Sequence, residues 1–112
     1  MDPFTIAGAI ALGKLIFGGA AVISVVGTLV YISRVKIKIL VNWFITINHY
    51  KKSSNHALSI KKQLRSGKRV IVQGIFDSDG DFVSKKAVRT IEYDSMSSKV
   101  QNLHREGIVE YT

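Results

Sequence analysis

Residues 15–33, LIFGGAAVISVVGTLVYIS, form a stretch of nineteen residues without a charged side chain. Residues 34–69, which follow directly, contain ten Lys or Arg and no Asp or Glu. As a helix, the uncharged stretch is long enough to cross the roughly 30 Å of membrane hydrocarbon. Positive charge beside a span marks its cytoplasmic side. The pattern predicts a single-pass protein of the cell inner membrane, with its N-terminus outside and its C-terminal part in the cytoplasm.

The same boundary divides the chain into two predicted parts. Residues 1–33 would be the membrane anchor, and residues 34–112 a basic cytoplasmic domain large enough for one small core. The first residues, MDP, lack the positive charge of a secretory signal peptide, so we expect the anchor to be uncleaved. The chain has no Cys, which excludes disulfides, thiolate metal sites and a Cys nucleophile.

Lys14 is the one charged residue between Phe4 and Ser33. Its long side chain could reach the outer membrane interface, as Lys side chains near helix ends do. Alternatively it could face the inside of a helix bundle or a pore, because charges within a span usually serve function. The sequence leaves both arrangements open.

Small residues recur along the predicted span at spacings of seven and four. They form a predicted helix-association face, which consists of Gly13, Ala20, Ser24, Gly27 and Thr28. Small side chains let helix backbones approach closely in lipid, where packing drives association. We therefore expect the chain to form a homo-oligomer.

The remaining residues show the patterns of strands and helices in alternation. Apolar residues alternate with polar ones over residues 35–49, which predicts a long strand. A helix over residues 55–66, strands over 70–76 and 82–93, a helix that starts at Asp94 or Ser95 and ends before Gly107, and a strand over 108–111 follow. The order β-α-β-β-α-β predicts an α+β fold of the ferredoxin-like type, joined to the N-terminal transmembrane helix.

The motifs of enzymes and metal sites are incomplete in this chain. The Asp-rich segment at residues 77–81 lacks the Gly and Glu positions of a calcium loop, so we interpret it as a turn. Ser66-Gly67-Lys68-Arg69 lacks the first Gly and the final Ser or Thr of a phosphate-binding loop. The three His residues lack metal-ligand spacing. We expect no catalytic residues, no metal and no cofactor.

Basic residues indicate two kinds of anionic partner. Those next to the predicted span would lie at the membrane surface: Arg34, Lys36 and Lys38. A second cluster is the candidate anion-binding site: Lys61, Lys62, Arg65, Lys68 and Arg69. Its ligand could be a nucleotide, an oligonucleotide or an anionic lipid. The expected partners are thus the lipid bilayer, further copies of the chain and an anion.

Three functions fit these features. The first is a non-enzymatic membrane protein that self-associates through its helix and binds an anionic partner through its basic domain. The second is a ligand-gated membrane effector or pore whose basic domain senses a nucleotide or oligonucleotide. The third is a structural subunit of a larger membrane complex.

Overall fold

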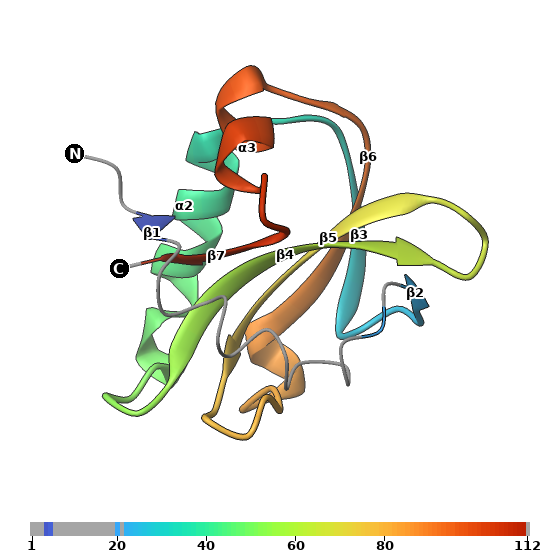
Figure 1. Cartoon of the computed structure of the whole chain (residues 1–112). Helices are drawn as coiled ribbons and strands as arrows, with labels where there is room; N and C mark the ends of the chain where they lie inside the picture. Colours follow the sequence, from blue (N-terminus) through green and yellow to red (C-terminus); the bar gives the residue numbers. More distant parts are fainter. Residues whose placement is uncertain (1–3, 6–19, 21, 112) are drawn as a thin grey trace.

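A computed structural model describes residues 4–5, 20 and 22–111 of the chain, with Thr5 described by its backbone alone (Figure 1). Seven strands are seen: β1 (Phe4–Thr5), β2 (Val22–Ile23), β3 (Thr28–Val35), β4 (His56–Leu64), β5 (Arg69–Phe76), β6 (Val88–Met96) and β7 (Ile108–Tyr111). The helices are α2 (Ile37–Thr46) and α3 (Ser98–Leu103), with short 3-10 turns η2 (Asn48–Tyr50) and η3 (Lys85–Ala87).

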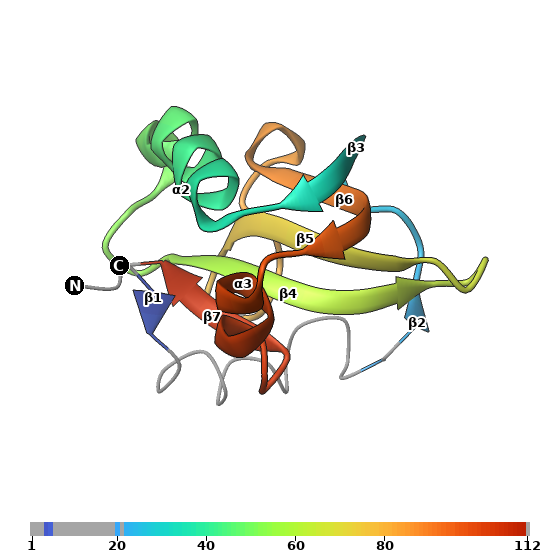
Figure 2. The ribbon, with the colours of Figure 1, turned by 90° about the horizontal axis from the view of Figure 1, so that it is seen from above.

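All described strands belong to one mixed sheet with the order β1-β7-β4-β5-β6-β3 (Figure 2). The pairs β1–β7, β7–β4, β4–β5 and β5–β6 are antiparallel, whereas β6–β3 is parallel. The short β2 pairs in parallel with the end of β4, on the edge that β7 occupies further back. Strand β3 is therefore one end of the sheet, and β1 is the other.

The predicted transmembrane helix is wrong for the described part of its sequence. Val22–Ile23 and Thr28–Val35 are strands, and no described helix is long and apolar enough to cross a membrane. The single-pass placement in the inner membrane and the transmembrane fold class are corrected accordingly. An uncharged run rich in Val and Ile suits a strand as well as a span, because β-branched side chains favour extended chain. Gly13 and Lys14 lie outside the described residues.

The predicted ferredoxin-like order is also wrong, because two elements exchange their types. Residues 37–46 form α2 and residues 56–64 form β4. The apolar alternation over residues 35–49 is interrupted by Leu40 and Phe44, and these two are buried. Together with buried Ile47 they are spaced four and three apart, which is the inner face of a helix.

Several local predictions are confirmed. Strands form over residues 69–76 and 108–111, close to the predicted limits. The Asp-rich segment is a turn in which Asp77 Oδ1 accepts hydrogen bonds from the backbone N–H groups of Asp79 (2.9 Å) and Asp81 (3.1 Å). The second helix begins later than predicted, at Ser98, where the Ser97 side chain caps it.

The central strands are buried on both faces of the sheet. On β5, Ile71 and Ile75 belong to the core cluster that contains side chains of α2 and α3. Val70 and Val72 belong to a second cluster on the opposite face. Apolar residues on both faces explain why VIVQGIF shows no alternation with polar residues.

Candidate functional site

The sheet divides where β5 and β6 separate. These strands pair from Gly74–Val88 to Val70–Glu92. Beyond that point β6 continues beside β3 as far as Met96. The start of β5, by contrast, stays paired with β4, and a tight turn joins these two strands into a hairpin. Figure 1 shows this hairpin extending to one side while β6 leads to α3. Two cavities open at the division, one on each side of it.

The larger cavity measures about 420 Å³ and lies between the dividing strands and α3. Its lining residues are Lys61, Arg69, Tyr93, Asp94, Ser95, Met96, Gln101, Asn102 and Arg105. Three of them are cations from different segments: Lys61 on β4, Arg69 on β5 and Arg105 after α3. Asp94 is the one carboxylate in the lining. We call this cavity the basic cleft.

Strand register brings Lys61 and Arg69 to the same face of the sheet. Lys61 pairs with Ile71, and Gln63 pairs with Arg69, so the two cations are diagonal neighbours. Such neighbours are roughly 7–8 Å apart, within reach of one ligand between long side chains.

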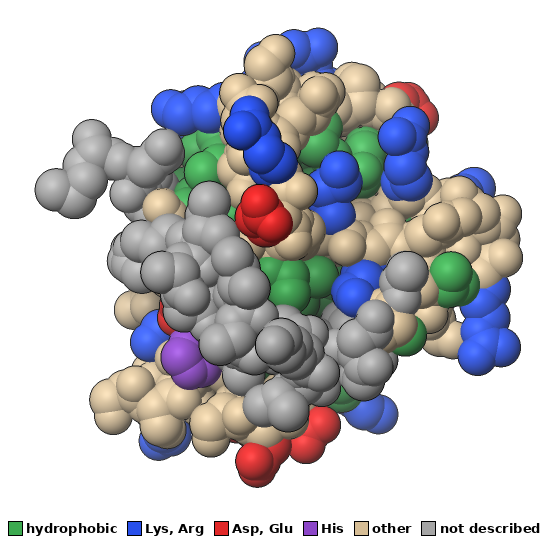
Figure 3. All heavy atoms as spheres, in the orientation of Figure 1, with side chains coloured by type: hydrophobic (Ala, Val, Ile, Leu, Met, Phe, Trp, Pro, Cys, Tyr) green, Lys and Arg blue, Asp and Glu red, His purple; other side chains and the backbone are tan. Residues whose placement is uncertain are grey.

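Arg105 comes to the cleft through the anchoring of the chain after α3. The backbone N–H of Lys61 donates to the carbonyl of Gly107 at 2.7 Å, and the N–H of Gly107 donates to the carbonyl of His104 at 2.8 Å. His104 itself is buried. Arg105 is thus held beside β4 by contacts on both sides of it. Figure 3 shows Lys and Arg side chains gathered over α3 and the adjoining part of the sheet.

The smaller cavity, about 220 Å³, shares Arg69, Tyr93 and Asp94 with the basic cleft. Its carboxylates are both engaged. Glu92 forms an ion pair with Lys68 at 3.7 Å, and Asp94 accepts a short hydrogen bond from the Tyr31 hydroxyl. Within the described part of the chain, Lys61, Arg69 and Arg105 form no ion pair with a carboxylate. Three cations therefore face the cleft against one carboxylate, and none of the three is ion-paired with it.

Two of these cations affect the pKa of a titratable neighbour. Burial raises the pKa of the Tyr93 phenol, and the Arg69 charge offsets part of this rise. Burial lowers the pKa of His104, a hydrogen bond to the Val100 carbonyl opposes the change, and the Lys61 charge adds to the lowering. Arg69 and Lys61 thus act on the phenol beside the cleft and on the imidazole beneath it.

The structure separates the five cations of the predicted anion site. Lys61 and Arg69 line the basic cleft, and Lys68 lines the smaller cavity. The Lys62 ammonium donates to the carbonyl of Ala20 at 2.6 Å, and burial lowers its pKa. Arg65 lines a separate cavity of about 270 Å³ with Ile23 and other residues. A helix would have gathered Lys61, Lys62 and Arg65 on one arc, whereas a strand sends successive side chains to opposite faces.

Sequence reasoning missed Arg105. It lies far along the chain from the other cations, and tertiary packing of α3 brings it to β4. One available signal was its position near a predicted helix C-terminus, where a cation is favoured by the helix dipole.

The other predicted site residues lie outside the basic cleft. Ala20, Ser24 and Gly27 are exposed in irregular or bent chain, and Thr28 begins β3, so these four share no helix face. Arg34 lies on β3, Lys36 is the residue before α2, and Lys38 lies on its first turn.

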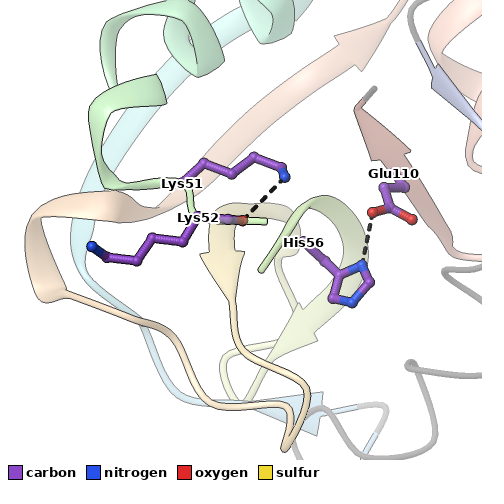
Figure 4. A network of polar contacts seen from close by, with 4 residues as sticks. All are labelled: Lys51, Lys52, His56 and Glu110. Carbon is purple, nitrogen blue, oxygen red and sulfur yellow. Dashed lines mark hydrogen bonds and ion pairs between the residues drawn. The ribbon is translucent and has the colours of Figure 1, made fainter. Parts of the chain in front are cut away.

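Two other polar clusters offer less for binding or catalysis. Figure 4 shows His56 of β4 beside Glu110 of β7, and Lys51 beside the Lys52 carbonyl. Nδ1 of His56 and Oε2 of Glu110 are 2.8 Å apart, and the Lys51 ammonium donates to the Lys52 carbonyl at 3.4 Å. The first contact joins neighbouring strands. Ser59 and His104 form a hydrogen-bonded pair, but Ser59 is 0 % exposed, so a substrate could not reach its hydroxyl. Among the described residues, no three His, Asp or Glu side chains are placed to hold a metal ion.

Comparison with known protein families, with curated proteins and with solved structures found no match to this chain. The observed class is therefore given by the architecture itself, a small sheet-dominated α+β domain with two described helices.

Proposed function

We propose that this chain is a non-enzymatic binding module whose basic cleft holds a phosphate-bearing anion. One observation carries the proposal. Lys61, Arg69 and Arg105 come from three segments and line one cavity of about 420 Å³ without an ion-paired carboxylate among the described residues. Three positive charges that share one cavity with a single carboxylate repel one another, and an anion that binds between them relieves this repulsion.

The side chains of the cleft match the chemistry of a phosphate group. Two guanidinium groups can each donate paired hydrogen bonds to phosphate oxygens, and the ammonium of Lys61 supplies a further charge. Gln101 and Asn102 add amide donors to the rim. The cavity volume lies within the roughly 300–1,000 Å³ range of small-molecule sites. A nucleotide or a phosphorylated headgroup therefore suits the cleft better than an extended polymer.

Binding without catalysis is supported by the surroundings of the cleft. A nucleophile with an accessible base is the usual sign of group transfer. The Ser59–His104 pair beneath the cleft is fully buried, and each partner already has its hydrogen bonds. The cations that line the cavity, Lys61, Arg69 and Arg105, can bind an anion but do not form a pair of nucleophile and base.

Calorimetric titration of the full chain with pyrophosphate tests the proposal. Pyrophosphate presents the shared chemistry of nucleotides and phosphorylated lipids without a base or an acyl chain. We expect saturable binding that Arg69→Ala and Arg105→Ala each weaken about tenfold or more, because each removes a charge-assisted contact of about 1.5–3 kcal/mol. Lys85→Ala is the matched control, since Lys85 is an exposed cation on η3 away from the cleft.

Two outcomes would contradict the proposal: no heat of binding, or equal weakening by Lys85→Ala and Arg69→Ala. Two further titrations distinguish the source of the phosphate. Adenosine triphosphate tests a soluble nucleotide, and vesicles containing phosphatidic acid test a lipid headgroup. The stronger binder identifies the ligand class, and the same two Arg variants show whether it uses the basic cleft.

A further inference from the structure

Strand β3 ends the sheet on the side opposite β1. One edge of β3 pairs with β6 from Thr28–Arg89 to Val35–Met96. No described strand pairs with its other edge. The outward backbone N–H and C=O groups of an end strand form a template for a further strand.

Over residues 28–33, this edge lacks the features by which proteins usually protect an end strand, and Arg34 is the one charged residue of β3. Residues 28–33 contain neither a charge nor a Pro. The register with β6 keeps the same offset at both ends of the strand, so no bulge twists the edge away. Charges, Pro and bulges are the common means of preventing edge-to-edge pairing. At eight residues, β3 is also long for an open edge.

The side chains of β3 suit an apolar neighbour. Leu29 and Tyr31 are 47 % and 61 % exposed, although both are large. Val30 and Ile32 pack only partly against the core beneath the helices. An added strand with the same alternation would cover apolar surface on both faces of the sheet.

We propose that β3 pairs antiparallel with β3 of a second copy of this chain, about a two-fold axis. The edge fits a second copy of itself because each strand presents apolar side chains on both faces of the sheet. A two-fold contact also closes without forming a fibre. Antiparallel pairing places the two Arg34 side chains at opposite ends of the contact. An acidic peptide would find no cation in residues 28–33 to meet it, so an uncharged strand is the better occupant.

The size of the contact sets its strength. Eight residues on each side are fewer than the roughly 20–30 residues of a standard stable interface. The dimer should therefore be reversible and depend on protein concentration. Sedimentation velocity of the unmodified full chain should show a monomer that converts to a dimer as its concentration rises. A single monomeric species at every concentration would overturn the proposal.

Cysteine cross-linking locates the contact, because the natural chain contains no Cys. We expect Tyr31→Cys, near the middle of β3, to form disulfide-linked dimers under mild oxidation. Ile45→Cys is the matched control, since Ile45 is 60 % exposed on α2. Ala20→Cys reports on association through the segment before β3, where Ala20 is also exposed. Equal cross-linking at Tyr31→Cys and Ile45→Cys, or cross-linking at Ala20→Cys alone, would overturn the proposal.

Charge substitution provides a second test that leaves the Tyr31–Asp94 hydrogen bond in place. Leu29→Lys puts an ammonium group on the edge of each copy, as natural edge strands do. We expect it to raise the dimer dissociation constant several-fold, whereas Ile45→Lys leaves the constant unchanged. Circular dichroism of each variant confirms that its fold is retained. Dimerisation that persists unchanged in a folded Leu29→Lys variant would contradict pairing through β3.

Discussion

The Ser59 hydroxyl donates a hydrogen bond to Nε2 of His104 across the contact between β4 and the end of α3, with the two atoms 2.7 Å apart. The direction follows from the second ring nitrogen, because Nδ1 lies 2.7 Å from the Val100 carbonyl and can only donate to it. His104 is 1 % exposed. A neutral imidazole therefore joins the helix to the sheet, and a protonated ring would have to donate from Nε2 to the Ser59 oxygen instead.

Stability should depend on pH through His104. Burial lowers the folded-state pKa of His104 below the ordinary value of 6.5. The unfolded chain then binds more protons than the folded one, so the stabilisation is complete above about pH 6.5 and declines as the pH falls toward the folded-state pKa. The decline cannot exceed about 1.4 kcal/mol per pH unit for one proton. Urea unfolding between pH 7 and pH 5 measures it.

The comparison that isolates this effect is His104→Gln against His49→Gln. His49 is exposed, so its substitution should leave the pH dependence as it is in the natural chain. His104→Gln should flatten the dependence. A natural chain whose stability is constant over this range would show that His104 titrates normally.

Removal of the hydroxyl from Ser59 should destabilise the fold by about 1–3 kcal/mol, because Ser59→Ala leaves Nε2 of His104 buried without a donor. Ser53→Ala, in the exposed loop before β4, removes the same hydroxyl where water replaces its contacts. Urea midpoints of the two variants give the comparison. A Ser59→Ala variant as stable as Ser53→Ala would show that the buried pair contributes nothing.

Local chemistry made part of this fold predictable from sequence. The turn after β5 follows from Asp77, whose carboxylate accepts backbone hydrogen bonds within four residues. The strand VIVQGIF follows from its short length and apolar content. Such elements depend on neighbours in sequence, and their residue types specify them directly.

The helix α2 and the strand β4 needed information from distant segments. Residues 36–47 carry apolar side chains on almost every side, so their pattern fits the two-residue period of a strand as well as the 3.6-residue period of a helix. Burial of Leu40 and Phe44 against the sheet favours the helix. Strand β4 is stabilised by pairing with β5 and β7, which its own residues do not reveal. The same limit applies to the cleft, since Lys61 and Arg69 were predictable as cations but Arg105 joins them only through packing of α3.

Gly27 illustrates how one residue changes its role between a span and a sheet. On the predicted helix it would have been a contact for a second helix. In the structure its φ is 66°, and an added Cβ would lie 2.1 Å from the carbonyl oxygen of Val88. The preceding Val26 exchanges hydrogen bonds with the Thr90 side chain, which holds this turn against β6. Gly27 thus permits the close approach that starts β3.

Gly27→Ala should consequently destabilise the fold far more than Gly107→Ala. Both positions have positive φ, 66° and 89°, and so share a backbone strain of about 1 kcal/mol for Ala. Nothing lies within 4 Å of an added Cβ at Gly107, so the difference between the variants measures the clash at Gly27. We expect that difference to exceed about 2 kcal/mol in thermal or urea unfolding. Equal losses would show that the turn shifts freely.

Gln73 is the hydrogen-bond acceptor for the half-buried guanidinium of Arg89. Its Oε1 accepts hydrogen bonds from Nε and Nη2 of Arg89, at 2.9 and 2.6 Å, while its Nε2 donates to the carbonyl of Leu40 at 3.2 Å. The guanidinium of Arg89 also lies 4.6 Å from the ring centre of Trp43, and burial lowers its pKa to about 10. Gln73 therefore satisfies a charge that has no carboxylate partner among the described residues.

Gln73→Leu should cost about 2 kcal/mol of stability, because it leaves the Arg89 guanidinium buried without its acceptor. The double variant Gln73→Leu with Arg89→Leu should recover part of this loss, since it removes the stranded charge. Trp43 is the one Trp of the chain, so its fluorescence reports on the displacement of Arg89. A double variant that loses more stability than the two single variants lose together would contradict this account.

The final prediction links the basic cleft to the buried imidazole beneath it. The Lys61 charge contributes to the low pKa of His104, so Lys61→Met should raise that pKa toward 6.5. Lys62→Met removes the same charge from the next residue, whose side chain points to the opposite face of the strand, and should leave the His104 pKa nearly unchanged. Proton NMR titration of the His104 ring measures both. A bound phosphate beside Lys61 should raise the pKa in the natural chain for the same electrostatic reason, and should have less effect in Lys61→Met. Equal pKa values in the two variants would show that Lys61 lies too far from the imidazole to influence it.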